Sequence, residues 1–166
     1  MIECLTVAAP VGDLLLLSNG AALTHCLFAG ESGPLSAAHW RDGSNSPVLA
    51  EARRQLQAYF ARELRDFSLP LAPEGTAFQL QVWQQLGLIP YGATWSYGEL
   101  ARRLGHPKAA RAVGMANSRN PLSIIVPCHR VIGGSGALIG YGGGLERKAM
   151  LLDLEQGRQT LGLPMA

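Results

Sequence analysis

The sequence lacks the long apolar runs and paired cysteines of membrane proteins and disulfide-rich secreted proteins. No apolar run approaches the ~20 residues that cross a bilayer, and no basic segment followed by an apolar stretch marks a signal peptide at Met1. The three cysteines, Cys4, Cys26 and Cys128, form no CxxC pair, which excludes a cysteine-rich zinc knuckle. We therefore expect a soluble, cytoplasmic protein with reduced thiols and no membrane contact.

Charge is also scarce, at 16% of 166 residues, whereas hydrophobic residues make up 48%. This balance permits a buried core and argues against disorder. Residues 1–74 carry five arginines against eight acids, a net charge of −3, whereas residues 75–166 carry nine basic residues against four acids, a net charge of +5. The basic half either meets a polyanion or presents a solvated face, and charge alone leaves both readings open.

The first half of the chain predicts a small sheet followed by one helix. Residues 4–8, 14–18 and 23–29 are apolar strands separated by turn residues, including the hairpin pair Asn19-Gly20. A loop rich in Gly, Ser and Pro spans residues 30–48, and apolar positions at a helical period span 49–65. The proline-bearing stretch 69–74 is the expected domain boundary, which gives domains of 1–74 and 75–166.

The second half predicts short helices. Thr76 with Gln79, and Ser96 with Glu99, have capping-box spacing before apolar periodic segments. A turn at 105–107, in which Pro107 is placed like a proline at the start of a helix, leads into a helix at about 108–117. Two short helices around a glycine-containing turn favour a helix-turn-helix, although an ordinary pair of core helices has the same pattern.

The chemistry lies in residues 120–132. The apolar run 124–126 predicts a buried extended segment, and it is followed by Pro127, Cys128, His129 and Arg130. A free thiol has a pKa near ~8.5, so a neighbouring base or cation is needed to raise its thiolate fraction. Adjacent strand residues point to opposite faces, so His129 reaches Cys128 only through a turn or a bridging water. A buried cysteine beside a histidine that merely packs remains the alternative.

The segment Ile125-Val126-Pro127-Cys128-His129-Arg130-Val131 resembles the active-site motif of the O6-alkylguanine-DNA alkyltransferases, also called methylated-DNA–protein-cysteine methyltransferases. Its surroundings agree with this family: Arg111 to Gly114 and Asn120-Pro121 precede it, and Gly140-Tyr141 and Leu151 to Glu155 follow it. The resemblance is strong over residues 76–157. Over residues 1–75 it is weak and rests on the turn at 9–12 and on Tyr59-Phe60.

The resemblance implies a catalytic role for each of five residues. Cys128 is the alkyl acceptor, His129 takes the thiol proton through a water, and Glu155 orients the imidazole. The three residues thus have the roles of a catalytic triad: nucleophile, base and orienting carboxylate. Asn120 braces the turn between the recognition helix and the active-site segment. Tyr97 donates a hydrogen bond to the guanine ring as negative charge develops on it.

The resemblance also implies a DNA interface and a base pocket. Arg111 fills the space left by a nucleotide flipped out of the duplex. The second helix is expected to lie in the minor groove of the DNA. The small residues Ala109, Ala112 and Gly114 would contact the walls of the groove, and the basic residues Lys108 and Arg119 would contact phosphates. Arg102 and Arg103 are either phosphate contacts or exposed rim charges. The pocket is lined by Tyr141, the amide of Gly142, the carbonyls of Cys128 and Val131, and Ser123.

The resemblance implies an α/β protein in which a small, RNase H-like N-terminal sheet domain precedes a mostly helical winged helix-turn-helix domain. The expected activity is stoichiometric repair of O6-alkylguanine in double-stranded DNA by a monomer, with O4-alkylthymine as a second candidate substrate. We expect no cofactor and no zinc, because only Cys4 could match a family zinc ligand. Three rivals remain: an alkyltransferase-like protein that binds lesions without repair, a helix-turn-helix regulator, and a thiol hydrolase.

Overall fold

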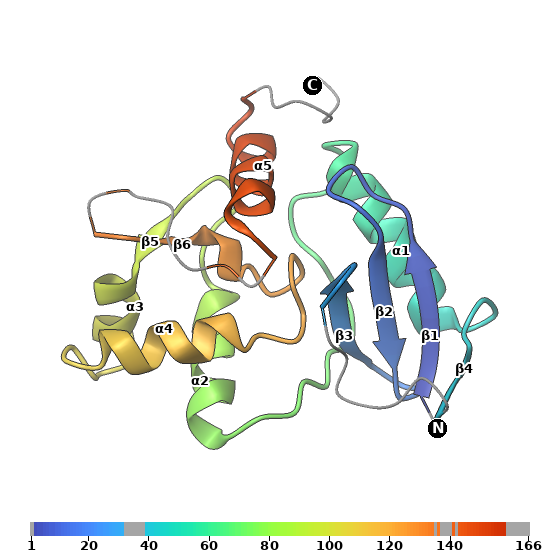
Figure 1. Ribbon diagram of the computed structural model, residues 1–166, viewed down its shortest axis with the longest axis horizontal. Helices are drawn as coiled ribbons and strands as arrows, with labels where there is room; N and C mark the ends of the chain where they lie inside the picture. Colours follow the sequence, from blue (N-terminus) through green and yellow to red (C-terminus); the bar gives the residue numbers. More distant parts are fainter. Residues whose placement is uncertain (1, 32–38, 135, 137–140, 142, 159–166) are drawn as a thin grey trace.

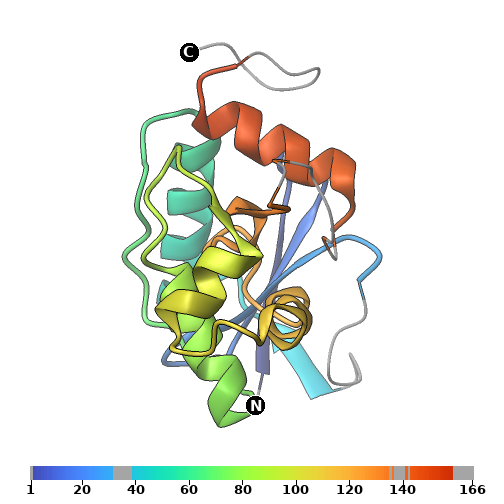
Figure 2. The same ribbon diagram turned by 90° about the vertical axis from the view of Figure 1, so that its left-hand side faces the viewer.

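The computed structural model describes residues 2–31, 39–134, 136, 141 and 143–158. The chain forms two parts that lie side by side, a sheet with one helix and a group of short helices (Figure 1). The last helix, α5, lies above the junction between them and crosses the helical part in the rotated view (Figure 2). The predicted α/β arrangement, with strands first and helices second, is confirmed.

The N-terminal part is a four-stranded sheet in the order β3-β2-β1-β4, with α1 packed against it. The β1-β2 and β2-β3 pairs are antiparallel, and β4 runs parallel to β1. Its elements are β1 (Ile2–Val7), β2 (Leu14–Ser18), β3 (Leu23–Phe28), β4 (Trp40–Asp42) and α1 (Pro47–Phe60).

Local sequence explains most of these boundaries. The β2-β3 turn forms at Asn19-Gly20, where the Asn19 side chain accepts hydrogen bonds from the amides of Ala21 and Ala22 and Gly20 has a φ of 95°. Ser46 caps α1, and Pro47 occupies its first turn. The helix ends at Phe60 rather than at 65, because Arg62 adopts a left-handed φ of 61° without the glycine that usually signals such a stop.

The C-terminal part contains helices α2, α3 and α4, which pack on one another, and a two-stranded parallel sheet of β5 and β6. Cys128 begins a 3₁₀ turn, η2, which leads directly into β6. Its elements are α2 (Ala77–Leu86), β5 (Trp95–Ser96), α3 (Tyr97–Arg103), α4 (Ala110–Ser118), η2 (Cys128–Arg130), β6 (Val131–Ile132) and α5 (Leu145–Glu155).

Of the two predicted capping boxes, one is complete in the structure and the other is only half formed. Thr76 and Gln79 form the complete reciprocal capping box at the start of α2. Ser96 accepts from the Glu99 amide, but the Glu99 carboxylate turns outward to Arg102 and Arg103. The helix expected over 108–117 is displaced: α4 begins at Ala110, so Pro107 lies in the preceding turn.

Residues 124–126 are buried, as expected, but they form a turn and not an extended segment. The amide of Val126 donates to the carbonyl of Leu122 at 2.9 Å, and Ile124 has a φ of 73°. A β-branched residue at positive φ is strained, so the surrounding packing must hold it there. The prediction was wrong because Ile and Val favour strands wherever tertiary packing does not override them.

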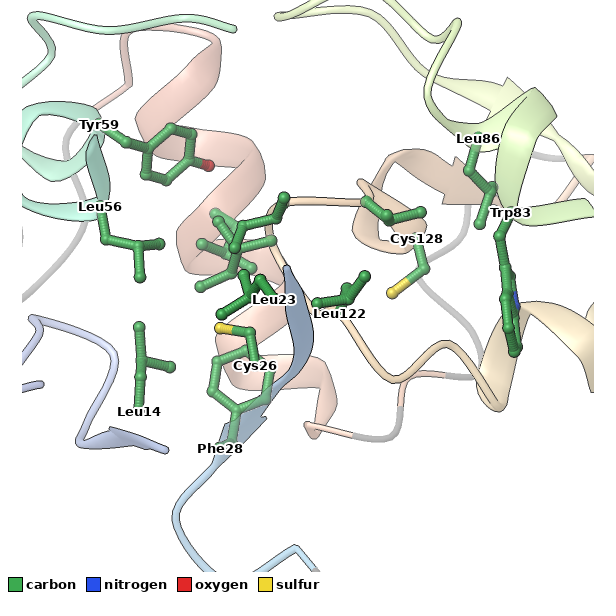
Figure 3. Packing of buried hydrophobic residues seen from close by; sticks show 14 of the residues in the cluster. Leu14, Leu23, Cys26, Phe28, Leu56, Tyr59, Trp83, Leu86, Leu122 and Cys128 are labelled. Carbon is green, nitrogen blue, oxygen red and sulfur yellow. The ribbon is translucent and has the colours of Figure 1, made fainter. Parts of the chain in front are cut away.

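One apolar cluster runs through both parts of the molecule (Figure 3). Residues Leu14 and Leu56 contribute to it from the sheet and α1, and Trp83 and Leu86 contribute from α2. An isolated bridge between Cys26 in β3 and Leu122 ties the sheet to the turn that precedes Cys128. Within the described part of the chain, no helix is long and apolar enough to cross a membrane.

Candidate active site

Cys128 is the one of the three thiols that lines a recess. Cys26 is fully buried in β3, and burial raises its pKa far above the usual range, whereas Cys4 is half-buried in β1. The side chain of Cys128 is in the apolar cluster but retains 5% exposure. Burial raises the pKa of the Cys128 thiol to about 11, although hydrogen bonding from Asn120 and the charge of Lys148 act in the opposite direction. At neutral pH this thiol is protonated and needs a base to react.

His129 is oriented by a buried carboxylate. Its Nε2 lies 2.7 Å from Oε2 of Glu155, and both side chains are inaccessible to solvent. An ionised carboxylate only accepts hydrogen bonds, so Nε2 carries the proton and Nδ1 is left as an acceptor. Nδ1 has no hydrogen-bond partner among the described residues. Burial lowers the pKa of His129, against the opposing charge of Glu155, so the ring is neutral at pH 7.

Glu155 is the centre of this hydrogen-bond network. Arg130 donates through Nε to Oε1 at 2.7 Å and through Nη2 to Oε2 at 3.0 Å, and its Nη1 binds the carbonyl of Ile89. Tyr59 donates its hydroxyl to Oε2 at 2.6 Å. Burial alone would raise the pKa of Glu155, but His129 and Arg130 outweigh it and bring it to about 2. The carboxylate is therefore a permanent anion, fully paired inside the protein.

Asn120 fixes the turn that delivers Cys128. Its Oδ1 accepts from the amide of Leu122 at 3.0 Å, and its Nδ2 donates to the carbonyl of Val126 at 2.8 Å. These two hydrogen bonds connect Asn120 to both ends of the turn. Because Asn120 also hydrogen-bonds the Cys128 thiol, one side chain positions the backbone and stabilises the thiolate.

A small recess lies beside the Cys128 thiol. With a volume of about 10 Å³ it holds about one water and no purine. It brings together the predicted pocket residues Ser123 and Tyr141, whose ring packs edge-on against Phe28 at 6.0 Å. Its walls are completed by Glu31, Asn117, Ser118, Asn120 and Gly143. The predicted pocket residue Gly142 lies outside the described residues.

Tyr97 lies at the start of α3 and faces α4. Its ring is in van der Waals reach of Gly114, where an added Cβ would meet the ring at 3.6 Å, and its hydroxyl hydrogen-bonds Asn117. Burial and the nearby Cys128 raise the pKa of Tyr97, so its hydroxyl remains a donor. Gly114 therefore faces Tyr97 in the structure, and its contact with DNA, which the family resemblance implies, stays a prediction.

The two carbonyls expected to read a guanine amine already have intramolecular donors. Asn117 Nδ2 lies 3.4 Å from the carbonyl of Cys128, and Lys148 Nζ lies 2.5 Å from that of Val131. The amide of Val131 also donates to the carbonyl of Cys128, so both lone pairs of that oxygen already have donors. A guanine amine at this carbonyl would therefore have to replace or share the long hydrogen bond from Asn117.

The outer face of α4 carries the predicted interface. Arg111, Ala112 and Arg119 are exposed, as is Lys108 in the turn before the helix, and Ala109 is half-buried. Arg111, Lys108 and Arg119 make no ion pair with any described residue. A groove of about 570 Å³ runs along this face and is lined by Thr76, Phe78, Gln79, Lys108, Ala109, Arg111, Ala112, Met115 and Ala116.

Arg102 and Arg103 differ from these cations. Both pair with Glu99, at 2.6 and 2.9 Å, and the guanidinium of Arg103 lies 4.0 Å from the centre of the Trp95 ring. Because Glu99 partly compensates their charge within α3, Arg102 and Arg103 fit the description of exposed surface charges better than that of unpaired phosphate contacts.

Four polar residues of the site had no role assigned from sequence: Tyr59, Asn117, Arg130 and Lys148. Lys148 and Glu155 share a helical face with Leu151 and Leu152. A lysine on an otherwise apolar helical face is unusual, so the sequence pattern could have indicated that Lys148 has a buried partner. Asn117 is likewise a polar residue on the buried side of α4. Tyr59 gave no signal, because an aromatic residue on an amphipathic helix is ordinary core. Among the described residues no cluster of His, Cys, Asp or Glu is arranged to hold a metal.

Comparison with known families covers both parts of the chain. The model described as 6-O-methylguanine DNA methyltransferase, DNA binding domain, matches residues 77–157, and the ribonuclease-like domain of the same family matches residues 3–73. The methylated-DNA–protein-cysteine methyltransferase of Mycobacterium leprae is 53% identical over 94% of this chain and 93% of its own. Its namesake in Methanosarcina acetivorans is 50% identical over 89% and 94%, respectively.

Comparison with solved structures points to the same family. The crystal structure of Mycobacterium tuberculosis OGT in complex with DNA is 47% identical, with a TM-score of 0.87 over 97% of this chain and 96% of that one. The expected ribonuclease-like sheet domain followed by a DNA-binding domain is therefore confirmed as the fold. Because its two halves match one family and its relatives share about half of their residues with it along nearly their whole length, the chain belongs to the 6-O-methylguanine DNA methyltransferase family.

Proposed function

We propose that this protein repairs DNA by transferring the alkyl group of O6-alkylguanine to Cys128 in a single, stoichiometric reaction. The observation that carries the proposal is the buried array in which a thiol in a recess is followed by an imidazole held 2.7 Å from a permanent carboxylate. The names of the relatives and their DNA complex support the same activity. O4-alkylthymine is a second candidate substrate.

The chemistry is a displacement at the alkyl carbon. The thiol proton of Cys128 passes to Nδ1 of His129 through one bridging water, and Glu155 stabilises the imidazolium that forms. The sulfur then forms a C–S bond to the alkyl carbon while the C–O6 bond breaks. The electron pair of the broken C–O6 bond stays on the guanine. Tyr97 donates to this developing anion, which ends as neutral guanine once it gains a proton. The product is a stable thioether, so each molecule acts once.

The substrate must leave the duplex to reach the thiol. Flipping a nucleotide costs a few kcal/mol, less where pairing is already weakened. We expect Arg111, which is exposed on α4, to fill the vacated space, and Ala109 and Ala112 to let the helix approach the walls of the minor groove. Lys108 and Arg119 supply phosphate contacts whose sequence-independent attraction suits a search for damage.

The recess must widen for a base to enter. Its present volume accommodates about one water beside Cys128, but a guanine needs lining residues such as Tyr141 and Ser123 to move apart. Once a base is bound, its exocyclic amine donates to the carbonyls of Cys128 and Val131, and at Cys128 it takes the place of the long hydrogen bond from Asn117. We further propose that the protein acts as a monomer in the cytoplasm, where its three thiols stay reduced.

The test is the intact mass of the protein after incubation with a duplex oligonucleotide containing O6-methylguanine. A gain of one methyl group, mapped to Cys128 and absent in Cys128→Ser, is the expected result. A lesion-binding protein or a DNA-binding regulator would bind the duplex with no gain in mass. A thiol hydrolase would turn over an activated ester repeatedly and leave the methylated base unchanged. Any of these three outcomes overturns the proposal.

A further inference from the structure

A tyrosine from the N-terminal part lies in the hydrogen-bond network of the active site. Tyr59 sits near the end of α1, far before the catalytic motif in the sequence, and its side chain is fully buried. Its hydroxyl donates to Oε2 of Glu155 at 2.6 Å, the same oxygen that His129 contacts at 2.7 Å. The part of the molecule that otherwise serves as scaffold thus contributes one hydrogen bond to the site.

The direction of this bond follows from chemistry. Glu155 is ionised and offers only lone pairs, so Tyr59 must be the donor. Burial, followed by the neighbouring carboxylate, raises the pKa of Tyr59 well above its ordinary value, so the hydroxyl keeps its proton. The short distance is typical of an O–H donor on a charged acceptor.

The position of the ring is fixed by aromatic neighbours from three segments. Phe60 and Phe67 have ring centroids 5.1 and 5.4 Å from that of Tyr59, and Tyr91 packs edge-on at 6.3 Å. In Figure 3 the ring of Tyr59 extends from α1 with its oxygen directed toward α5, on which Glu155 lies. Such packing leaves the hydroxyl little freedom to choose another partner.

We propose that Tyr59 is a positioning residue that tunes how strongly His129 holds a proton, by sharing the Glu155 oxygen that stabilises the imidazolium. This inference rests on the proposed function, because it gives the N-terminal part a role in the alkyl-transfer site. One carboxylate oxygen that accepts from two donors offers less negative charge to each. Without the hydroxyl, more of that charge acts on His129.

The predicted direction depends on the other charges around the pair. Arg130 binds both oxygens of Glu155, Lys148 lies near the imidazole and the thiol, and the phenol of Tyr91 faces the Tyr59 ring. Tyr59→Phe removes one oxygen atom and leaves all of these groups in place. The charge felt by His129 therefore changes only through Glu155, and the pKa of His129 rises.

The experiment compares wild-type protein with Tyr59→Phe by two measurements. The first is the single-turnover rate of methyl transfer from a duplex oligonucleotide as a function of pH. The second is the pH titration of the His129 ring nitrogens by NMR. We expect both the acidic limb of the rate profile and the His129 titration to move upward by about one pH unit.

Phe67→Leu is the matched control, because it removes one aromatic neighbour of the Tyr59 ring, keeps the hydroxyl, and leaves Phe60 and Tyr91 to hold the ring in place. It should lower the melting temperature with no movement of either curve. If the curves of Tyr59→Phe superimpose on wild type, or if Phe67→Leu moves them equally, Tyr59 is only structural and the inference is wrong. If wild-type protein transfers no methyl group, the proposed function fails, and the His129 titration still decides the role of Tyr59.

Discussion

Lys148 Nζ donates a hydrogen bond of 2.5 Å to the carbonyl oxygen of Val131, and both residues are fully buried. Burial lowers the pKa of Lys148, and in its charged form this lysine places a positive charge next to the active-site segment. That charge lowers the pKa of the Cys128 thiol against the larger opposing effect of burial. Lys148 therefore makes the thiol easier to ionise, in addition to fixing the Val131 carbonyl.

Lys148→Met should make Cys128 less reactive. Loss of the cation raises the thiol pKa, and we expect reaction with a small disulfide reagent at pH 8 to slow about tenfold, equivalent to one pKa unit. The measurement subtracts the rate of Cys128→Ser to remove the contribution of Cys4. Arg147→Met is the control, because Arg147 is a neighbouring cation that binds the carbonyl of Val11 and not the thiol segment. Equal rates in Lys148→Met and wild type would contradict this role.

Arg111→Ala should impair repair in duplex DNA and spare reaction with the free base O6-methylguanine. The arginine compensates for the flipped nucleotide, a cost that exists only in the duplex. A loss of about 1.4 kcal/mol of stabilisation would slow duplex repair about tenfold. The comparison uses single-turnover rates for the two substrates. Arg102→Ala, which removes an exposed arginine already paired with Glu99, should change neither by more than about twofold. Equal losses on both substrates in Arg111→Ala would contradict the role of Arg111.

Asn120→Ala should both destabilise the fold and reduce transfer. It removes the bonds to the Leu122 amide and the Val126 carbonyl and leaves those buried groups without their partner, at a cost of about 1–3 kcal/mol. The turn that holds Ile124 at positive φ loses its brace, so Cys128 is no longer delivered to the recess. Urea unfolding and the transfer rate measure the two effects. A variant as stable and as active as wild type would show that packing alone holds the turn.

Candidate residues for the chemistry could be named from sequence because the motif that carries the family resemblance is contiguous. Cys128 and His129 are adjacent, and the motif around them also identified Asn120 and Glu155. The conformation of residues 124–126 could not be predicted, because β-branched residues favour a strand. Here the hydrogen bonds of Asn120 and the packing of the core hold them in a turn instead. The start of α4 was misplaced by two residues, since Pro107 is an acceptable first helical residue and only the folded turn shows otherwise.

The network around Glu155 depends on packing between segments far apart in the chain. Tyr59 lies 96 residues from Glu155, and nothing in an amphipathic helix pattern distinguishes a tyrosine that packs from one that also donates a hydrogen bond. Lys148 could have been noticed as a charge on the apolar face of α5, but its partner, a backbone carbonyl in β6, has no sequence signal. The domain boundary at residue 74 and the role of each site residue stay predictions.

Glu155→Gln should shift the pH dependence of transfer in the direction opposite to Tyr59→Phe. Glu155 favours the imidazolium of His129, so removal of its charge lowers the pKa of His129 and moves the acidic limb of the rate profile to lower pH. The plateau rate also falls, by about a hundredfold, because the proton acceptor loses its stabilising anion. Asp153→Asn on the same helix is the control, since Asp153 pairs with Arg158 outside the site.

The same substitution should change how stability depends on pH. The pKa of Glu155 is depressed to about 2 in the folded protein, below its usual value of 4.5. Its ionised form therefore stabilises the fold fully above about pH 4.5, and this contribution is lost as pH falls from there toward 2. In Glu155→Gln the protein is less stable at pH 7, and its free energy of unfolding falls less steeply between pH 4.5 and 2 than in wild type. Urea unfolding at several pH values measures both slopes, and parallel slopes would show that Glu155 is not held as an anion by Arg130 and His129.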